Sequence, residues 1–345
     1  MVVLAKGELE EIALPAVQKA AASPVADVPE IDLGWEDAAA AVVAACEGNG
    51  FFKVTGHGVA PELLARVEAA AAAFFAMTPP EKEAAAGVPP GSPFGYGSKR
   101  IGSNGDLGWV EYLLLAVTAA GETAPLSAGG EASPSPAFCL FRDLLNEYVV
   151  AVRSMACNLL GLIAEGLGLR EKDALVRLVS HEESDSMLRV NHYPPHPELK
   201  LPLQLQGHGN LTGFGEHTDP QIISVLRSND TSGLEISLRD GSWASVPPDR
   251  NSFFVNVGDL LQVLTNGRFR SVRHRVMVSS PRPRVSVIFF AGPPPQERLV
   301  PLPWLVAEDG GHRRYREFTW REYKASADRT KLAENRLCHF ETEDD

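Results

Sequence analysis

The chain has 345 residues, with 44 acidic against 32 basic side chains and a formal net charge of −12. Apolar residues make up 44% of it, which is ordinary for a globular protein that buries a full core. Electrostatic binding of nucleic acid needs a basic face that displaces counterions, so the acidic balance argues against that class of function.

The cysteine pattern and the N-terminus indicate an intracellular protein. The four cysteines are dispersed and form no C-x-x-C pair, which disfavours a zinc ribbon or a disulfide scaffold; they are Cys46, Cys139, Cys157 and Cys338. The apolar run Val2–Ala5 is too short for a signal peptide, and the alanine-rich stretch Ala69–Met77 is about half the length that crosses a bilayer. We expect a cytoplasmic location, with the nucleus as an additional one, and no membrane partner.

The first half of the chain reads as mainly helical. Residues 29–33 and 51–54 have the character of short strands, and the 3.6-residue spacing of apolar side chains predicts a long helix from Phe141 to about Gly166. The remaining expectations for this half are a helix over 36–47, a helix over 61–77, an ordered loop over 87–108 and a mobile insertion over 119–137.

After Ser180 the apolar pattern changes to that of strands. Short β-rich runs follow one another with turn signals between them and no helix, which predicts an antiparallel sandwich or barrel. These runs cover residues 187–193, 221–227, 234–238, 243–246, 253–257, 271–278 and 284–290. The tail over 308–331 is expected to be partly helical, so the fold class is α+β, with a helical N-terminal region, a β core and a C-terminal helical extension.

A candidate metal site lies in the strand region. His217 and Asp219 are two residues apart, so in an extended segment they point to one side, and His274 follows on a later strand. Two imidazoles and one carboxylate on one face of an octahedron suit non-haem Fe(II), which must keep positions open for a co-substrate and O₂. The alternatives are a zinc hydrolase site and, for the H-x-D pair alone, a surface histidine beside a turn aspartate.

A candidate anion site follows ten residues after His274. Arg284 and Ser286 face the same way on a strand that is otherwise apolar, so a guanidinium and a hydroxyl can bind one carboxylate together. The alternative is an exposed arginine at a strand edge, which the apolar neighbours Val285 and Val287 disfavour.

In this order, His217-x-Asp219, His274 and Arg284-x-Ser286 resemble the plant 2-oxoglutarate- and Fe(II)-dependent dioxygenases. The resemblance implies a distorted double-stranded β-helix, or jelly roll, at 181–300, preceded by a region of the dioxygenase N-terminal type at 1–180 and followed by an extension at 301–345. It further implies that His217, Asp219 and His274 hold the iron. The co-substrate 2-oxoglutarate would be bound by the catalytic Arg284 and by Ser286, Tyr193 and Asn191.

A narrower likeness points to the gibberellin 2-oxidases. It rests on residues 94–102, on Gly108-Trp109-Val110-Glu111-Tyr112, on residues 226–234 and on residues 266–275. The implied reaction is 2β-hydroxylation of nineteen-carbon gibberellins, which inactivates the hormone, with O₂ as the second co-substrate, release of succinate and CO₂, and ascorbate as a supporting reductant. The only partner implied is the small-molecule substrate; the oligomeric state stays open.

Two features depart from the family pattern. His196 stands where the proline-rich motif commonly has a cysteine, and the segment Leu199–Gly215 before the H-x-D is longer than expected. His192, His196 and His208 are weaker candidates for metal ligands, because histidines in proline- and glycine-rich loops are commonly solvated. His57, between two glycines, is expected to stabilise a turn.

A gibberellin presents a carboxylate on a rigid apolar skeleton, so its site should pair one cationic fork with apolar walls. Arg100 is the leading candidate for that fork, with Tyr96 and Ser98 beside it and Tyr323 at the mouth of the site. Two other functions remain open: the same chemistry on a flavonoid or another plant hormone, and a jelly-roll protein that binds hormone without turning it over.

Overall fold

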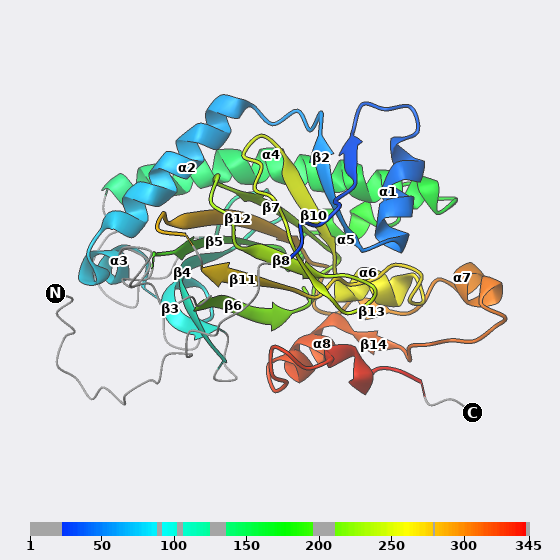
Figure 1. Cartoon of the computed structure of the whole chain (residues 1–345). Coiled ribbons are helices and arrows are strands. Elements are labelled where there is room, and N and C mark those ends of the chain that lie inside the picture. The colour runs from blue at the N-terminus through cyan, green and yellow to red at the C-terminus, as the bar shows by residue number, and fades with distance from the viewer. Residues whose placement is uncertain are drawn as a thin grey trace.

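The computed structural model describes residues 23–87, 92–101, 106–124, 136–195, 211–278 and 280–342. The protein has an α+β fold in which helices cover one face of a large sheet and a small sheet covers the other (Figure 1). The large sheet has eight strands in the order β1-β2-β10-β7-β12-β5-β4-β3, and the small sheet has four in the order β6-β11-β8-β9. Apart from the parallel pair β1–β2, neighbouring strands in both sheets are antiparallel, which gives the distorted jelly roll that the sequence predicts.

The strands of the large sheet come from both halves of the chain. They are β1 (Glu30–Asp32), β2 (Phe51–Thr55), β3 (Gly95–Ile101), β4 (Asp106–Ala116), β5 (Met187–Tyr193), β7 (Ile223–Ser228), β10 (Phe253–Val257) and β12 (Arg284–Ala291). The small sheet consists of β6 (Leu211–His217), β8 (Leu234–Ser237), β9 (Trp243–Ser245) and β11 (His274–Val278). A two-stranded sheet, β13 (Arg298–Leu299) and β14 (Phe318–Thr319), lies in the C-terminal extension.

The helices flank this sandwich. Those of the first half are α1 (Ala38–Glu47), α2 (Pro61–Ala76), α3 (Pro79–Ala86), α4 (Pro136–Gly166) and α5 (Val176–Ser180). Those of the second half are α6 (Asp259–Leu264), α7 (Pro303–Glu308), α8 (Trp320–Ala327) and a 3₁₀ helix over Arg336–His339. The helix expected over 61–77 ends at Ala76, and a new helix begins at Pro79 because Thr78 and Glu81 form a capping box.

Side chains on the two faces of the large sheet pack into two separate cores. On β12, Val285, Val287 and Phe289 pack toward the helices, whereas Ile288 belongs to the core between the two sheets. Helix α4 lies along the helical face, with 12 of its 31 side chains buried there. By length and composition α4 could also span a membrane, a test that the core helix of a globular protein passes as well.

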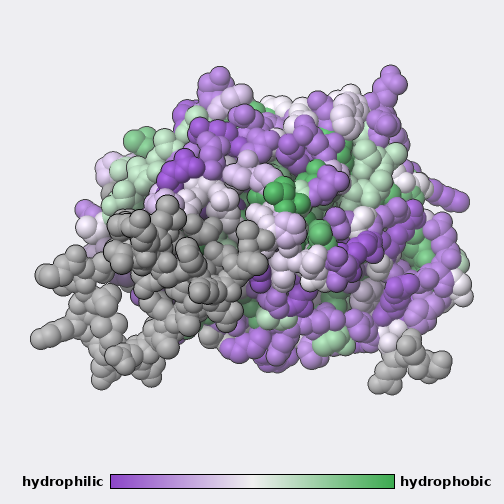
Figure 2. All heavy atoms as spheres, in the orientation of Figure 1, coloured by the Kyte–Doolittle hydropathy of each residue, from purple (hydrophilic) through white to green (hydrophobic). Residues whose placement is uncertain are grey.

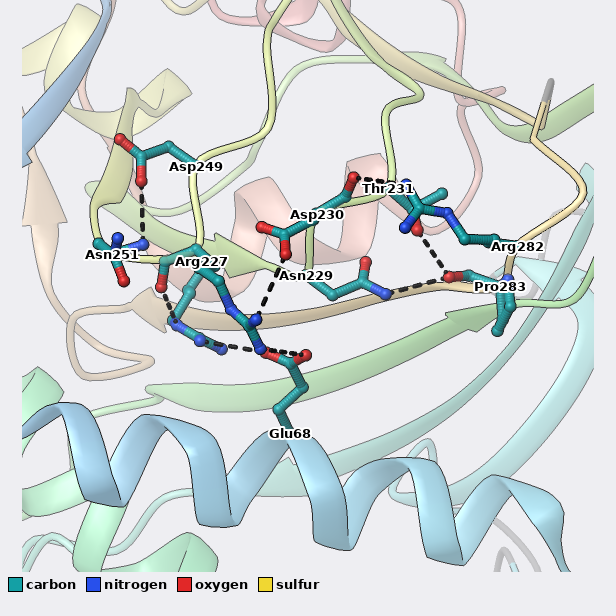
Figure 3. Close-up of polar contacts among 10 residues, drawn as sticks. Glu68, Arg227, Asn229, Asp230, Thr231, Asp249, Asn251, Arg282 and Pro283 are labelled. Carbon is teal, nitrogen blue, oxygen red and sulfur yellow. Dashed lines mark hydrogen bonds and ion pairs between the residues drawn. The ribbon is translucent and has the colours of Figure 1, made fainter.

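A polar network fastens α2 to the core. Arg227 of β7 is buried; it donates from Nη2 to Oε2 of Glu68 on α2 at 3.1 Å and from Nε to the carbonyl of Arg250 at 3.0 Å (Figure 3). Arg250 then donates to the other oxygen of Glu68 at 3.1 Å, so one carboxylate is shared by two guanidinium groups. On the face shown in Figure 2, the surface of the described residues is largely hydrophilic.

The structure corrects three expectations for the local structure. Residues 95–101 form strand β3 rather than a loop, and the paired strand β4 was not predicted. The β half contains a helix, α6, between β10 and β11. The segment 199–215 includes the start of strand β6 at Leu211; its remainder, with His208, lies outside the described residues. His196 and most of the insertion at 119–137 lie outside them as well.

Candidate active site

Three side chains that could hold a metal ion meet between the two sheets. His217 is the last residue of β6, His274 is the first residue of β11, and the two are paired in the small sheet. Asp219 lies two residues beyond β6, and its Oδ1 is 3.6 Å from Nε2 of each histidine. The three ligand atoms lie within 4.8 Å of one another. The chain thus brings together the three residues that the sequence singles out as metal ligands.

Neighbouring groups hold these three side chains in position. Nδ1 of His217 is 2.8 Å from the carbonyl oxygen of Gly215, and Nδ1 of His274 is 3.2 Å from that of Val272, so each ring can donate there and present Nε2 to the cluster. Burial, and then the neighbouring His274, lower the pKa of His217 well below its ordinary value, which favours the neutral imidazole that binds metals. Asn256 of β10 donates to Oδ2 of Asp219 at 3.1 Å and leaves Oδ1 facing the histidines.

The C-terminal extension helps to stabilise the turn between His217 and Asp219. Thr218 donates to Oδ2 of Asp259 at 3.0 Å, and the hydroxyl of Tyr323 donates to the same oxygen. Tyr323 is fully buried and does not line the cavity, so its position at the mouth of the site, expected from the sequence, is wrong. Its contacts are those of a residue that fixes the metal-binding turn.

A buried cation lies on the large sheet, across from the three ligands. Arg284 begins β12 opposite Tyr193 of β5, and Ser286 is paired with Asn191. Arg284 is 4% exposed, and within the part of the chain that the structure describes its Nε and Nη1 have no hydrogen-bond partner. Burial lowers the pKa of Arg284, but a guanidinium keeps its charge in proteins. An unpaired buried charge is costly, so this pocket is built for an anion that enters from outside the chain.

The two groups open into one cavity of about 240 Å³. Its walls carry the three candidate ligands and all four residues expected to bind 2-oxoglutarate. The rest of the lining is largely apolar and includes Ile101, Leu114, Met187, Phe214, Ile288 and Phe290. A cavity with apolar walls and a few convergent polar groups is the usual form of a small-molecule site.

These residues fit iron and 2-oxoglutarate. Two neutral imidazoles and a carboxylate are the donor set of non-haem Fe(II) sites. The unpartnered edge of Arg284 and the hydroxyl of Ser286 match a carboxylate geometrically and electrostatically. The candidate metal ligands and the candidate co-substrate residues thus line one cavity.

The residues expected to bind the substrate lie elsewhere. Arg100 and Ser98 are exposed on β3, where a bulge at Lys99 (φ 61°) interrupts the pairing with β4. Tyr96 is buried and donates to Glu111 at 2.7 Å. Of this stretch Ile101 lines the cavity.

Two arginines in the cavity wall were not predicted. Arg189 of β5 precedes Asn191 by two residues, so strand alternation places it on the same face as Asn191 and Tyr193; that signal was present in the sequence. Arg336 of the C-terminal 3₁₀ helix reaches the cavity as well and donates from Nη1 to the carbonyl of Thr218 at 3.2 Å. No sequence pattern connects Arg336 with the strand residues, because only the packing of the extension brings it there.

Two other described histidines, His57 and His192, have structural partners. His192 lies 2.7 Å from Oε1 of Glu111 and stacks on Phe75. The ring of His57 accepts a hydrogen bond from the backbone of Val59 and bonds to the carbonyl of Asn251, which confirms its expected role in a turn.

Comparisons with known proteins agree with this geometry. The model of the 2OG-Fe(II) oxygenase superfamily matches residues 184–293, and the model of the N-terminal region of the non-haem dioxygenase in morphine synthesis matches residues 24–131. Gibberellin 2-beta-dioxygenase 1 of Pisum sativum is 51% identical over 91% of this chain and 90% of its own. Gibberellin 2-beta-dioxygenase 1 of Arabidopsis thaliana is 50% identical over 91% of this chain and 92% of its own.

Solved structures show the same fold at lower identity. The crystal structure of JOX2 in complex with 2OG, Fe and JA is 29% identical, has a TM-score of 0.77, and covers 97% of this chain and 96% of its own. The rice dioxygenase for auxin oxidation is 28% identical, with a TM-score of 0.71 over 92% of this chain and 100% of its own.

Proposed function

This chain belongs to the 2OG-Fe(II) oxygenase superfamily and, within it, to the gibberellin 2-beta-dioxygenases, and on that basis we propose that it hydroxylates gibberellins at carbon 2, on the β face, and so inactivates the hormone. The observation that carries the proposal is one cavity that joins a two-histidine, one-aspartate cluster to a buried arginine with unpartnered donors. Identity near 50% over nine-tenths of the chain supports the choice of substrate.

His217, Asp219 and His274 would hold Fe(II), and the carboxylate of 2-oxoglutarate far from the metal would be bound by Arg284 and Ser286. Iron and 2-oxoglutarate, when bound, supply the oxidising power that inserts one oxygen atom of O₂ into a C–H bond, with release of succinate and CO₂.

The protein's own contribution is positioning. Backbone carbonyls fix the two imidazoles, Asn256 fixes the carboxylate of Asp219, and Tyr193 and Asn191 stand opposite Arg284 and Ser286 across the strand pair. The apolar walls exclude water, so the substrate rather than solvent meets the oxidant.

The same chemistry on another plant metabolite is the second candidate, because the structural neighbours include a dioxygenase for auxin oxidation. A hormone-binding protein without activity is disfavoured by the complete set of iron and co-substrate residues.

The test is to incubate the purified protein with Fe(II), 2-oxoglutarate, ascorbate and a panel of nineteen-carbon gibberellins, auxin and flavanones, and to detect products by mass. We expect succinate and a gibberellin product that is heavier by one oxygen atom, and neither with Asp219→Ala. Oxidation of auxin or a flavanone without oxidation of any gibberellin would refute the assignment of substrate. Binding of gibberellin without succinate release or O₂ consumption would refute the enzyme.

A further inference from the structure

A buried carboxyl group, that of Asp259, contacts the turn that carries two of the candidate metal ligands. Asp259 is the first residue of α6, is 2% exposed, and is not among the residues that line the cavity. Its backbone N–H donates to the carbonyl of Asp219 at 2.8 Å, and its Oδ2 accepts from the hydroxyl of Thr218 at 3.0 Å. One residue of α6 thus holds both residues that follow His217.

The position of that carboxyl group depends in turn on the C-terminal extension. Tyr323 of α8 is fully buried, and its hydroxyl donates to the same Oδ2 of Asp259. The ring of Tyr323 packs against Trp320 and Phe340, with 5.6 Å between the ring centres in each pair. These aromatic neighbours fix the ring, so the hydroxyl holds the carboxylate in one place.

Arg336 is a second contact between the extension and the turn. It is 7% exposed, and its Nη1 donates to the carbonyl of Thr218 at 3.2 Å. Burial raises the pKa of Asp259, and the charge of Arg336 acts in the opposite direction. Thr218 is therefore held at its hydroxyl through Asp259 and at its carbonyl by Arg336.

Thr218 lies between two candidate ligands, so a shift of its backbone moves His217 and Asp219 together. The groups around the cluster therefore act at two levels. Asn256 orients the carboxylate of Asp219, whereas Asp259 orients the backbone to which that carboxylate is attached. A metal site binds tightly only when its ligands are held in the binding geometry before the ion arrives, and partners of this kind commonly determine the affinity.

We propose that Asp259 and Tyr323 are positioning residues of the metal site, which hold the His217-Thr218-Asp219 turn in its binding geometry and so couple the C-terminal extension to metal affinity. The inference rests on the proposed function only in that the cluster binds a metal ion; the organic substrate does not enter it. Coupling between two equilibria is reciprocal. A bound metal ion should therefore stabilise the docked extension as much as the extension strengthens metal binding.

The experiment is a titration of the metal-free protein with Co(II), whose visible absorption reports its coordination, without O₂, 2-oxoglutarate or gibberellin. In Tyr323→Phe the carboxylate of Asp259 loses one of its two hydroxyl donors and the ring is kept. We expect the affinity for Co(II) to fall about 10-fold, with a changed absorption spectrum of the bound ion.

Tyr315→Phe is the matched control, because it makes the same substitution in the same extension. Tyr315 is 5% exposed, and its hydroxyl accepts from Nε2 of Gln262, which also belongs to α6, at 2.9 Å. Each variant loses one buried hydrogen bond, so the melting temperatures of the two metal-free proteins should fall by similar amounts. The affinity of Tyr315→Phe for Co(II) should stay within about twofold of the wild-type value.

Two more substitutions test the route through the carboxylate of Asp259. Thr218→Val removes the other hydroxyl donor to the same oxygen and should lower the affinity about 10-fold; combined with Tyr323→Phe, the loss should be smaller than the product of the single effects. Asp259→Asn keeps an oxygen that can accept from both hydroxyls and should stay within about threefold of the wild-type affinity, whereas Asp259→Leu should lose about 100-fold. If Asp259→Leu does not fold, the tyrosine and threonine variants still decide.

Hydrogen exchange tests the reciprocal effect. Saturating Co(II) should slow the exchange of the backbone amides of α8 in the wild-type protein and in Tyr315→Phe. In Tyr323→Phe the same amount of bound Co(II) should slow this exchange less.

Unchanged Co(II) affinity in both Tyr323→Phe and Thr218→Val would overturn the inference, as would an equal loss of affinity in Tyr315→Phe, which would show a general effect of stability. Exchange in α8 that does not respond to the metal would overturn the reciprocal coupling. If the wild-type protein binds Co(II) and the variants respond as expected, but no gibberellin is oxidised with Fe(II), the proposed function is refuted and the inference holds. Absence of metal binding by the wild-type protein would overturn both.

Discussion

A buried ionic cluster between α3 and the large sheet allows a quantitative test of how the N-terminal half is held. Glu111 of β4 accepts from Lys82 at 2.5 Å and from the hydroxyl of Tyr96 at 2.7 Å, both on Oε2, while its Oε1 lies 2.7 Å from Nδ1 of His192. Among the described residues, Lys82 has in addition a contact at 3.3 Å to the carbonyl of Phe75, and its Nζ lies 5.1 Å from the ring centre of Tyr96. The perturbations are Glu111→Gln, Lys82→Met and the double variant.

The two single changes should differ because the two charges have different remaining partners. The side chain of Lys82 is 5% exposed, so Glu111→Gln leaves a buried ammonium group without its counterion; the free energy of unfolding should fall by about 3–5 kcal/mol. After Lys82→Met the carboxylate keeps Tyr96 and His192, and the loss should be about 1–2 kcal/mol. The double variant should lose less than the sum, with a coupling of about 1–3 kcal/mol.

Unfolding in guanidinium chloride measures these differences as shifts of the midpoint at constant slope. Tyr96→Phe, which removes one hydroxyl, is the control and should cost about 1 kcal/mol. A strictly additive double variant, or a larger loss for Lys82→Met than for Glu111→Gln, would refute the reasoning.

The same cluster predicts a pH dependence. Burial by itself raises the pKa of Glu111, but the hydrogen bonds from His192, Lys82 and Tyr96 outweigh it and hold the pKa below its ordinary value. A carboxyl with a depressed folded-state pKa stabilises the protein fully above its unfolded pKa and loses that contribution as the pH falls through the folded pKa. The stability gap between the wild-type protein and Glu111→Gln should therefore be constant near neutrality and shrink below about pH 4.5. A gap that grows on acidification would contradict this sign.

Three further outcomes are expected. Asn256→Leu removes the donor that orients Asp219, so the metal affinity measured by titration should fall about 10- to 100-fold. The melting profile of the metal-free protein should keep one transition. Unchanged metal affinity would show that Asn256 does not orient Asp219. Gly50→Ala should abolish soluble expression, because φ is +69° and the new Cβ would lie 1.8 Å from a backbone carbonyl oxygen; a folded variant would show that this loop can move. Burial raises the pKa of the Cys46 thiol whereas Cys338 is exposed, so iodoacetamide followed by peptide mass analysis should label Cys338 in the native protein and Cys46 only after unfolding; equal labelling would contradict this.

The site was predictable from the sequence wherever strand alternation and local order determine it. His217, Asp219, Arg284 and Ser286 could be chosen because residues two apart face one way, and the apolar flanks of Arg284 indicate its burial. Residues positioned by packing between distant segments, such as Arg336, give no such signal.

The local structure of residues 95–101 was predicted wrongly for a different reason. A glycine-rich segment has the composition of a loop, but Gly95 and Gly97 lie in a strand because the ring of Tyr112 needs the space beside Gly97. Arg100, the substrate candidate from the sequence, lies exposed on this strand and is not among the residues that line the cavity.

The candidate site is divided between two sheets, so we expect the stability of this protein to depend on the supply of iron and 2-oxoglutarate. The candidate iron ligands belong to the small sheet and the turn after β6, whereas Arg284 belongs to the large sheet. Iron held by the three ligands and 2-oxoglutarate held by Arg284 would contact both layers, and a ligand that binds only the folded protein would stabilise it by about 2.7 kcal/mol at one hundred times its dissociation constant. In a cell with little iron or 2-oxoglutarate, we therefore expect faster proteolysis of the protein as well as a lower rate of hydroxylation.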